Sequence, residues 1–278
     1  MILNNAAYKA TLTFILLLAF LQTASGQQAG VADRKRILVY SRNGTGYVHE
    51  NLAASNQCFR MISEELGLNA DVTDDPNAFT PSRLAGYAVV IFANTNNQAL
   101  VTDDQRLAFR RYMESGGRFM GIHSALGTER KWKWFKDMIG GTFDSHPPSQ
   151  EARIVITDPA HPSMQGLPKT WTKRDECYFL KETRAGSRVL MQHDLTAIKD
   201  PGTVGEKIAA AGKTYPAVWT DRFDGGLTWI TALGHESKDY ADPVFIRHLT
   251  NGLKFLLSEK IPPSKPYAIT KDDPIRKK

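Results

Sequence analysis

The sequence predicts an α/β fold built on a doubly wound parallel sheet, with extra strands in its C-terminal half. Two observations lead to this prediction. In the first half of the 278-residue chain, short apolar runs alternate with segments of helical spacing, which is typical of a parallel sheet. In the second half, apolar runs follow one another with turns between them, which favours one domain with an extended sheet over two domains.

Four strands and two long helices are expected in the first half. The run Arg36–Tyr40 is continuous and apolar, as in a strand that is buried on both faces. The segment Glu50–Leu66 carries its apolar residues on one helical stripe. Thr102 and Gln105 form a capping box, which predicts a helix that ends near Ser115. The other strands are expected at 70–73, 88–93 and 118–122.

The second half predicts strands at 152–157, 187–192, 217–220 and 227–232. The sequence Asp224-Gly225-Gly226 between the last two of these predicts a hairpin turn. An amphipathic helix at 243–257 closes the domain, which we place at 34–257. Prolines follow Lys260, so the basic segment 258–278 is predicted to be a loose tail.

Residues 1–26 have the organisation of a secretory signal peptide. Lys9 precedes the apolar run Thr11–Leu21, and small and polar residues follow up to Gly26. The alternative is a membrane anchor, but the run is about half of the ~20 residues that a spanning helix needs. We therefore expect no stable membrane span and an exported protein, in the periplasm or outside the cell.

The charge of the chain argues against a polyanionic partner. The formal net charge is +6, and no long basic run lies outside the tail, so we expect no nucleic-acid binding. A small neutral substrate fits this balance better. Cys58 and Cys177 could pair in an exported protein, but no CxxC spacing exists that would indicate a thiolate zinc site. The sequence gives no indication of the oligomeric state.

Polar residues follow the predicted parallel strands, where sites of doubly wound folds lie. His49, the segment 94–97 and His123 follow three such strands, and His235 follows the strand at 227–232. His123 stands at the centre of Gly121-Ile122-His123-Ser124-Ala125, which is arranged like a nucleophile elbow. A histidine there suits a base, an acid or a metal ligand, or it only binds a neighbouring backbone group. An acyl hydrolase would instead use Ser124 with a separate base.

Further candidates lie between these loops. Trp132 and Trp134 suit the faces of sugar rings, although core packing explains such a pair equally well. His146 and His161 each precede a proline, and we expect His161 in a surface turn. Of the adjacent carboxylates at 175 and 176, we expect Glu176 to face the pocket and the other to pair with Arg174.

Several motifs occur together in a characteristic order. They are Gly121-Ile122-His123, Gly127-Thr128-Glu129 with Trp132 and Trp134, His146-Pro147 with Gln150, Asp175-Glu176 with Tyr178, and Asp224-Gly225-Gly226 leading to Ala232-Leu233-Gly234-His235. In this set the chain resembles the ThuA-like (trehalose utilisation) family over about 36–257. The resemblance implies a flavodoxin-like fold of the class I glutamine amidotransferase-like superfamily.

The resemblance also implies a function. Glutaminase chemistry is not expected, because His123 stands where the amidotransferases have their catalytic Cys. ThuA-like proteins are linked to trehalose and related disaccharides through 3-keto sugars. The implied polar pocket comprises His49, His123, Glu129, His146, Glu176, Tyr178 and His235. The chain departs from the family pattern at Gly127, Cys177, Tyr215 and Leu227, where Asp, an aromatic residue, His and Arg are usual.

The leading hypothesis is a lyase or hydrolase of 3-keto-glycosides that works through an enolate, with sugar isomerisation as a near variant. The predicted catalytic residues are His123, Glu176 and His235. The predicted substrate-binding residues are His49, Glu129, Trp132, Trp134, His146 and Tyr178. A divalent metal ion would stabilise the enolate, and its candidate ligands are His49, His123, His146 and His235. The alternative is a non-catalytic carbohydrate-binding protein of the cell envelope.

Overall fold

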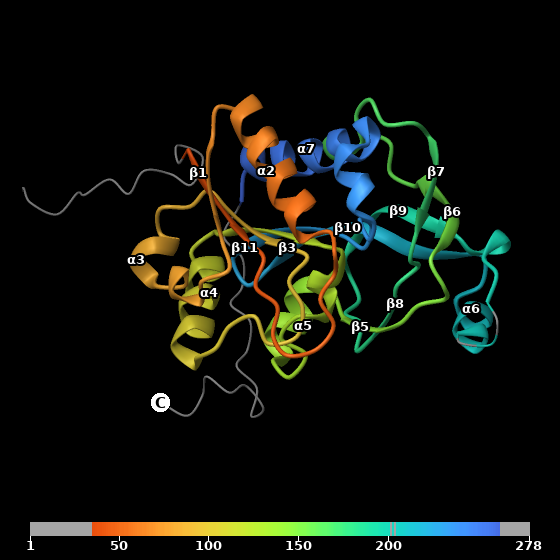
Figure 1. The fold of residues 1–278 in the computed structure, drawn as a ribbon, viewed down its shortest axis with the longest axis horizontal. Helices are drawn as coiled ribbons and strands as arrows, with labels where there is room; N and C mark the ends of the chain where they lie inside the picture. Colours follow the sequence, from red (N-terminus) through yellow and green to blue (C-terminus); the bar gives the residue numbers. More distant parts are fainter. Residues whose placement is uncertain (1–34, 201, 203, 262–278) are drawn as a thin grey trace, which may run out of the picture. The chain divides into compact units, whose positions relative to one another are not determined.

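A nine-stranded mixed sheet organises the part of the chain that the computed structural model describes, residues 35–200, 202 and 204–261 (Figure 1). The strand order is β2-β1-β3-β4-β11-β10-β9-β6-β7. The first five strands run parallel, and each later neighbour runs antiparallel to the one before it. This arrangement is a doubly wound parallel sheet with strands added by the C-terminal half, so the predicted fold class is confirmed.

The parallel part is formed by β2 (Asn69–Thr73), β1 (Arg36–Tyr40), β3 (Val89–Ala93), β4 (Arg118–Ile122) and β11 (Gly226–Thr231). The antiparallel part is formed by β10 (Thr214–Phe223), β9 (Arg188–Asp194), β6 (Gln150–Ile156) and β7 (Thr170–Asp175). A separate two-stranded ribbon pairs β5 (Thr142–Ser145) with β8 (Phe179–Lys181).

Helices cover both faces of the parallel strands. The long helices α2 (Leu52–Glu65) and α7 (Pro243–Ser258) lie on one face, and α3 (Pro81–Leu84), α4 (Asp103–Glu114) and α5 (Lys133–Ile139) lie on the other (Figure 1). A short helix, α6 (Gly205–Ala211), belongs to the C-terminal half.

The parallel strands are apolar on both sides because both of their faces are covered. In β1, Ile37 and Val39 belong to the core under α2 and α7, whereas Leu38 and Tyr40 belong to the core on the opposite face. All four side chains are fully buried. The continuous apolar run that predicted this strand therefore reflects two cores rather than one.

The predicted elements of the first half are present, with ends shifted by a few residues. The capping box of α4 is formed as predicted, because the Thr102 side chain accepts from the Gln105 amide and the Gln105 side chain accepts from the Thr102 amide. The predicted signal peptide at 1–26 and residues 262–278 of the predicted tail lie outside the described residues. No helix within the described part of the chain is long and apolar enough to cross a membrane.

The sequence prediction missed β7, and its composition explains why. Its inward-facing residues are Trp171, Lys173 and Asp175, so the expected alternation of apolar and polar residues is absent. The prediction also missed β5, β8 and α5, which are short. The helix α5 contains Trp134, and Trp132 is its N-cap residue.

The burial of side chains tests two further predictions, the possible disulfide and the surface turn at His161. Cys58 and Cys177 are both buried and free, so they form no disulfide. The expectation of a surface turn at His161 is wrong in one respect, since the side chain is 1% exposed and packs on Phe255 with ring centroids 4.4 Å apart. The chain does turn there, because the His161 ring accepts a hydrogen bond from the Ser163 amide.

Two buried histidines predict how stability depends on pH. Burial lowers the pKa of His193 to about 4 and that of His248 to about 3, from an ordinary value of 6.5. Between pH 6.5 and these values, only the unfolded chain takes up the two protons, so the free energy of unfolding must fall as the pH falls. Two protons correspond to a slope of at most about 3 kcal/mol per pH unit.

Urea unfolding at pH 7.0, 6.0 and 5.0 measures this slope. We expect the midpoint to drop steadily across the series. Because burial also lowers the pKa of His49 and of His161, the substitution His193→Gln should reduce the dependence by about a quarter. An unfolding free energy that stays constant from pH 7 to pH 5 would contradict the assignment of both histidines as neutral in the folded protein.

Candidate functional site

Three histidines and one glutamate meet at the carboxyl edge of the parallel strands. His49 lies in the loop after β1, His123 directly follows β4, and His235 follows β11. Glu176 comes from the other half of the chain, directly after β7. One ligand atom from each of these four side chains lies within 4.8 Å of the others. The topology therefore brings together all three residues that we predicted to be catalytic, together with His49.

His123 is the most constrained member of this group. It is fully buried and has a φ of +48°, a conformation that is uncommon for a residue other than glycine. Its Nδ1 lies 2.8 Å from the carbonyl oxygen of Ala232 on the neighbouring chain segment. A carbonyl oxygen only accepts, so Nδ1 must carry the proton. The lone pair of neutral His123 is therefore on Nε2, which faces the other residues of the cluster.

The atoms around His123 Nε2 are themselves polar and buried. His49 Nε2 lies 3.2 Å away and the Tyr178 hydroxyl 2.9 Å away. Burial, together with the neighbouring imidazoles, lowers the pKa of His49 to about 3, so this ring is neutral at physiological pH. Burial beside Glu176 raises the pKa of Tyr178 well above its ordinary value, so its hydroxyl stays protonated.

Glu176 supplies the negative charge of the cluster. Its carboxylate oxygens lie 3.6 Å from His123 Nε2, 3.2 Å from His235 Nδ1 and 3.5 Å from His146 Nδ1. Although burial acts to raise the pKa of Glu176, interactions with His123 and His235 hold it well below its ordinary value. The contact with Glu176 in turn raises the pKa of His235.

A buried carboxylate, Asp175, holds the backbone of this site together. It accepts hydrogen bonds from the amides of Glu176 at 2.9 Å, Gly234 at 2.9 Å and His235 at 3.3 Å. Lys173 lies between Asp175 and Asp239 and forms an ion pair with each. Asp175 therefore fixes both Glu176 and His235, which belong to segments about sixty residues apart in sequence.

The predicted partner of Asp175 was wrong. We expected Arg174, but alternation along β7 points Arg174 outward, where it donates to the carbonyl oxygen of Ser149 at 2.8 Å. Lys173, two residues before Asp175, shares its inward face. Although burial acts to raise the pKa of Asp175, the Lys173 ammonium holds it below its ordinary value.

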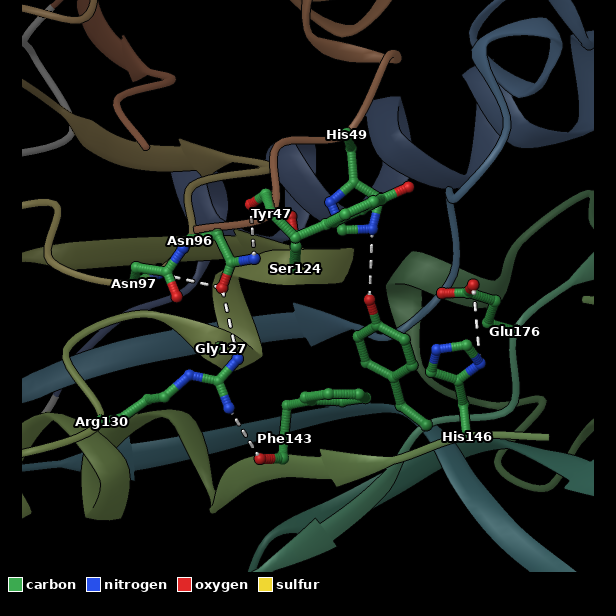
Figure 2. A pocket seen from close by; sticks show the side chains of 11 residues that line it. Tyr47, His49, Asn96, Asn97, Ser124, Gly127, Arg130, Phe143, His146 and Glu176 are labelled. Carbon is green, nitrogen blue, oxygen red and sulfur yellow. Dashed lines mark hydrogen bonds and ion pairs between the residues drawn. The ribbon is translucent and has the colours of Figure 1, made fainter. Parts of the chain in front are cut away.

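A cavity of about 350 Å³ opens beside the cluster (Figure 2). This volume lies in the range of small-molecule sites. Figure 2 shows His146 next to Glu176, and Arg130 between Asn96 and Phe143. The residues that line the cavity are Tyr47, His49, Asn96, Asn97, Ser124, Gly127, Arg130, Phe143, His146, Glu176 and Tyr178.

Of the predicted substrate-binding residues, the structure brings His49, His146 and Tyr178 to this cavity but not Glu129, Trp132 or Trp134. Glu129 is buried, and its carboxylate pairs with Arg106 at 2.8 Å. Trp134 is 1% exposed and donates from Nε1 to Asp224 Oδ2 at 2.7 Å within the core. A substrate-binding role for Trp134 does not fit this placement. Trp132 is also buried and stacks on Trp134.

The cavity contains residues that the sequence analysis did not single out. Arg130 and Phe143 were missed because neither follows a strand nor belongs to a motif with known chemistry. The segment 94–97 was expected at this edge, and Asn96 and Asn97 do line the cavity. Ser124 lines it as well, and its hydroxyl has no hydrogen-bond partner among the described residues.

The cluster fits a divalent transition-metal ion by its chemistry. Three imidazoles and one carboxylate form a donor set that is typical of Zn²⁺ and related ions. Histidine ligands usually donate their other ring N–H to a carbonyl or carboxylate, as His123 does toward Ala232. His49, His123, His235 and Glu176 are the residues that would hold such an ion. His146, which we also predicted as a ligand, is not part of this set of four.

The fold and the site together define an α/β protein of the flavodoxin and glutamine amidotransferase-like class, with histidines and a carboxylate at the carboxyl edge of its parallel strands. The family model ThuA, described as trehalose utilisation, matches residues 36–256. The chain therefore belongs to the ThuA family, for which a carbohydrate-related function is indicated.

Solved structures agree with this assignment of the fold. A putative ThuA-like protein from Bacteroides uniformis is 22% identical with a TM-score of 0.66, and the match covers 84% of this chain and 96% of that one. A putative ThuA-like protein from Parabacteroides merdae is 18% identical with a TM-score of 0.64, with 84% and 95% covered. The carbohydrate deacetylase Agd3 is 14% identical with a TM-score of 0.51, and the match covers 80% of this chain but 32% of Agd3. No curated protein matches the chain.

The cluster leads to a prediction about metal binding. We expect the protein to bind about one Zn²⁺ or Mn²⁺ per chain, and His235→Gln to weaken that binding by at least tenfold because it removes one of four ligands. Equilibrium dialysis with elemental analysis measures both quantities.

His146→Gln is the matched control, since His146 also contacts Glu176 but lies outside the set of four. We expect this variant to bind the ion as the wild type does. Equal affinity in His235→Gln and wild type would show that the four groups do not act as a ligand set.

Proposed function

We propose that the protein is an exported enzyme that processes 3-keto-glycosides by elimination and hydration. The observation that carries this proposal is the convergence of His49, His123, His235 and Glu176 beside a cavity of sugar-binding size. Membership of a family linked to carbohydrate use supports the substrate class. A ketone at C3 acidifies the proton on C2, so the reaction needs a base, a donor for the leaving oxygen and stabilisation of an enolate.

The buried cluster suits the last of these requirements. A divalent ion, when bound, polarises a substrate carbonyl and stabilises the negative charge that develops on its oxygen. His123 is better suited to hold such an ion than to act as the base that we predicted. It is fully buried, and its Nε2 faces His49 and Tyr178.

Two side chains outside the ligand set are placed for proton transfer. His146 lines the cavity with a side chain that is 33% exposed, and its Nδ1 lies 3.5 Å from Glu176 Oε1. A partly exposed imidazole beside a carboxylate is a suitable general base. Tyr178 stays protonated and lines the same cavity, so it donates a hydrogen bond to a substrate oxygen.

The proposed reaction has two stages. His146 takes the proton from C2 and the C1–O bond breaks as the C1–C2 double bond forms. The departing oxygen then receives this proton from the His146 imidazolium, which restores the neutral base. Water then adds across this bond, with the hydroxyl at C1 and the proton at C2. The net result is hydrolysis of the keto-glycoside. Return of the proton to the opposite face of C2, or to C3 of the enediol, without loss of the C1 substituent would instead give the isomerase variant.

The alternative is a non-catalytic carbohydrate-binding protein, in which the polar loops and the Trp pair would serve recognition only. The Trp pair would provide a stacking surface for sugar rings, but its burial does not favour this role. Both indoles are 1% exposed, and Trp134 is bonded within the core. The alternative remains an outcome of the activity test.

Proton NMR of the protein with 3-ketotrehalose in D₂O tests the activity. We expect loss of the anomeric signal with exchange at C2, and a reduction of the rate by a chelator. His146→Gln should lower the rate by about 10²- to 10⁴-fold, because this is the usual contribution of one acid–base group.

Metal content and the unfolding midpoint of His146→Gln serve as controls, and both should match the wild type. Exchange at C2 without cleavage would favour an isomerase. If no keto-sugar changes with wild-type protein loaded with metal, the proposed reaction is wrong and the binding protein is favoured.

Export is part of the proposal and has its own test. The segment 1–26 has the features of a signal peptide, with Lys9 before an apolar run and small residues before Gly26. Expression of the full chain in a Gram-negative host should give a periplasmic protein whose intact mass corresponds to cleavage near Gly26. A full-length mass in the cytoplasmic fraction would overturn this part.

A further inference from the structure

A second cavity adjoins the histidine pocket. It has a volume of about 570 Å³, and it shares two lining residues, Asn97 and Arg130, with the first cavity. Glu129 and Trp132, which the sequence predicted to bind substrate, line this second cavity instead of the first. A ligand held at the histidines therefore has a neighbouring space into which a second unit can extend.

Two residues that line the second cavity carry hydrogen-bond donors without acceptors. Trp132 Nε1 and Asn97 Nδ2 are buried atoms without a hydrogen-bond partner among the described residues. The Trp132 side chain is 1% exposed, so bulk water does not satisfy its N–H. Unpaired buried donors are rare and costly, and a bound ligand is one of the few ways to satisfy them.

Three other tryptophans of the protein donate their indole N–H to an acceptor within the protein. Trp134 Nε1 donates to Asp224 at 2.7 Å, Trp219 Nε1 to the Ile139 carbonyl at 3.0 Å, and Trp229 Nε1 to Ser163 at 3.1 Å. Trp132 differs from these three because its N–H has no acceptor in the protein.

Charged residues of both signs line the second cavity, and not all of them form ion pairs with one another. Arg106 forms ion pairs with both Glu129 and Asp103, which leaves one negative charge in excess among these three groups. Lys131 and Arg130 also line the cavity, so its wall carries one more positive than negative charge. Arg130 has no carboxylate partner among the described residues. It donates instead to the Phe143 carbonyl at 3.1 Å and to Asn96 Oδ1 at 3.4 Å.

Contacts with Asn96 and Phe143 hold the Arg130 guanidinium in place (Figure 2). Its guanidinium also lies over the ring of Phe143, 5.4 Å from the centroid. A Cβ on Gly127 would come within 2.7 Å of Arg130 Nη2 and 2.4 Å of Asn96 Oδ1. A side chain at 127 would therefore displace the guanidinium from the wall between the two cavities.

We propose that the second cavity binds an oxyanion, a carboxylate or a phosphate, carried by the second unit of the sugar substrate. Arg130 supplies the charge, and Trp132 Nε1 and Asn97 Nδ2 supply directed hydrogen bonds. This inference rests on the proposed function for the link to a sugar that reacts at the histidines. The inference narrows the proposed substrate class from neutral to acidic disaccharides. Unpaired N–H donors beside a guanidinium without a carboxylate partner form a site that favours anions with several acceptor oxygens.

Titration of ¹⁵N-labelled protein with three probes tests this proposal. The probes are methyl α-D-glucopyranoside, methyl α-D-glucopyranosiduronate and glucose 6-phosphate, and the reporter is the indole N–H signal of Trp132, assigned with Trp132→Phe. We expect at least one charged probe to shift this signal at concentrations at least tenfold lower than the neutral probe. The two charged probes distinguish a carboxylate from a phosphate. The signals of Trp134 and Trp229 should not move, because their N–H groups already have acceptors.

Variants of Arg130 test the role of charge. Arg130→Gln should weaken binding of the charged probe by about tenfold to a hundredfold, while Arg130→Lys should retain part of it. Arg60→Gln is the matched control, because Arg60 is exposed on α2 and lines neither cavity. Equal binding of neutral and charged probes, or no shift with any probe, would overturn the proposal.

The test is independent of turnover. None of the probes carries a ketone, so the binding result holds whether or not the protein acts on 3-keto-sugars. Failure of the proposed reaction with retained, Arg130-dependent binding would leave the oxyanion site standing. Normal turnover of neutral 3-ketotrehalose without any probe binding would remove the oxyanion site alone.

Discussion

The buried carboxylate of Asp175 is the constraint on which the candidate site depends. In the order of the sheet, β7 is four strands away from β11, a separation of about 19 Å in a flat sheet. Asp175 at the end of β7 nevertheless accepts a hydrogen bond from Gly234 after β11 at 2.9 Å. The antiparallel half must therefore curl over the carboxyl edge of the parallel half. Lys173 keeps this arrangement stable, because removing one member of a buried ion pair leaves an uncompensated charge.

The contacts of Asp175 join segments that are far apart in sequence, whereas the position of His123 depends on the local backbone conformation after β4. A 3₁₀ helix, His123–Gly127, begins directly after β4, and His123 adopts a φ of +48° at this junction. Such conformations persist where the surroundings compensate their cost, and they cluster at functional sites. The compensation here includes the bond from His123 Nδ1 to the Ala232 carbonyl, which also selects the tautomer. One backbone carbonyl thus fixes both the orientation and the chemistry of this ring.

The sequence predicted the parallel half of the protein well, because its elements depend on local patterns. A continuous apolar run, a capping box and a polar residue after each strand are visible within a few residues, and His49, His123 and His235 could be placed at one edge from topology alone. The antiparallel half was predicted less completely because its key strand carries Lys173 and Asp175 on its inner face. Their burial is stable only because Asp239 and three backbone amides lie nearby, and such long-range partners leave no local pattern. The same reason explains why the Trp pair was ambiguous, since only the acceptor Asp224 decides that Trp134 belongs to the core.

The two halves contribute different chemistry to the site. The loops of the parallel half supply three imidazoles, of which His49 is neutral because burial lowers its pKa to about 3. The antiparallel half supplies Glu176, the carboxylate of the cluster. A divalent ion on such a set would keep a net charge of about +1, enough to attract an enolate oxygen and less costly to bury than a full double charge. The C-terminal half therefore contributes to the chemistry of the site as well as to the sheet. Its carboxylate, Glu176, lowers the cost of burying a divalent cation at the end of the apolar sheet.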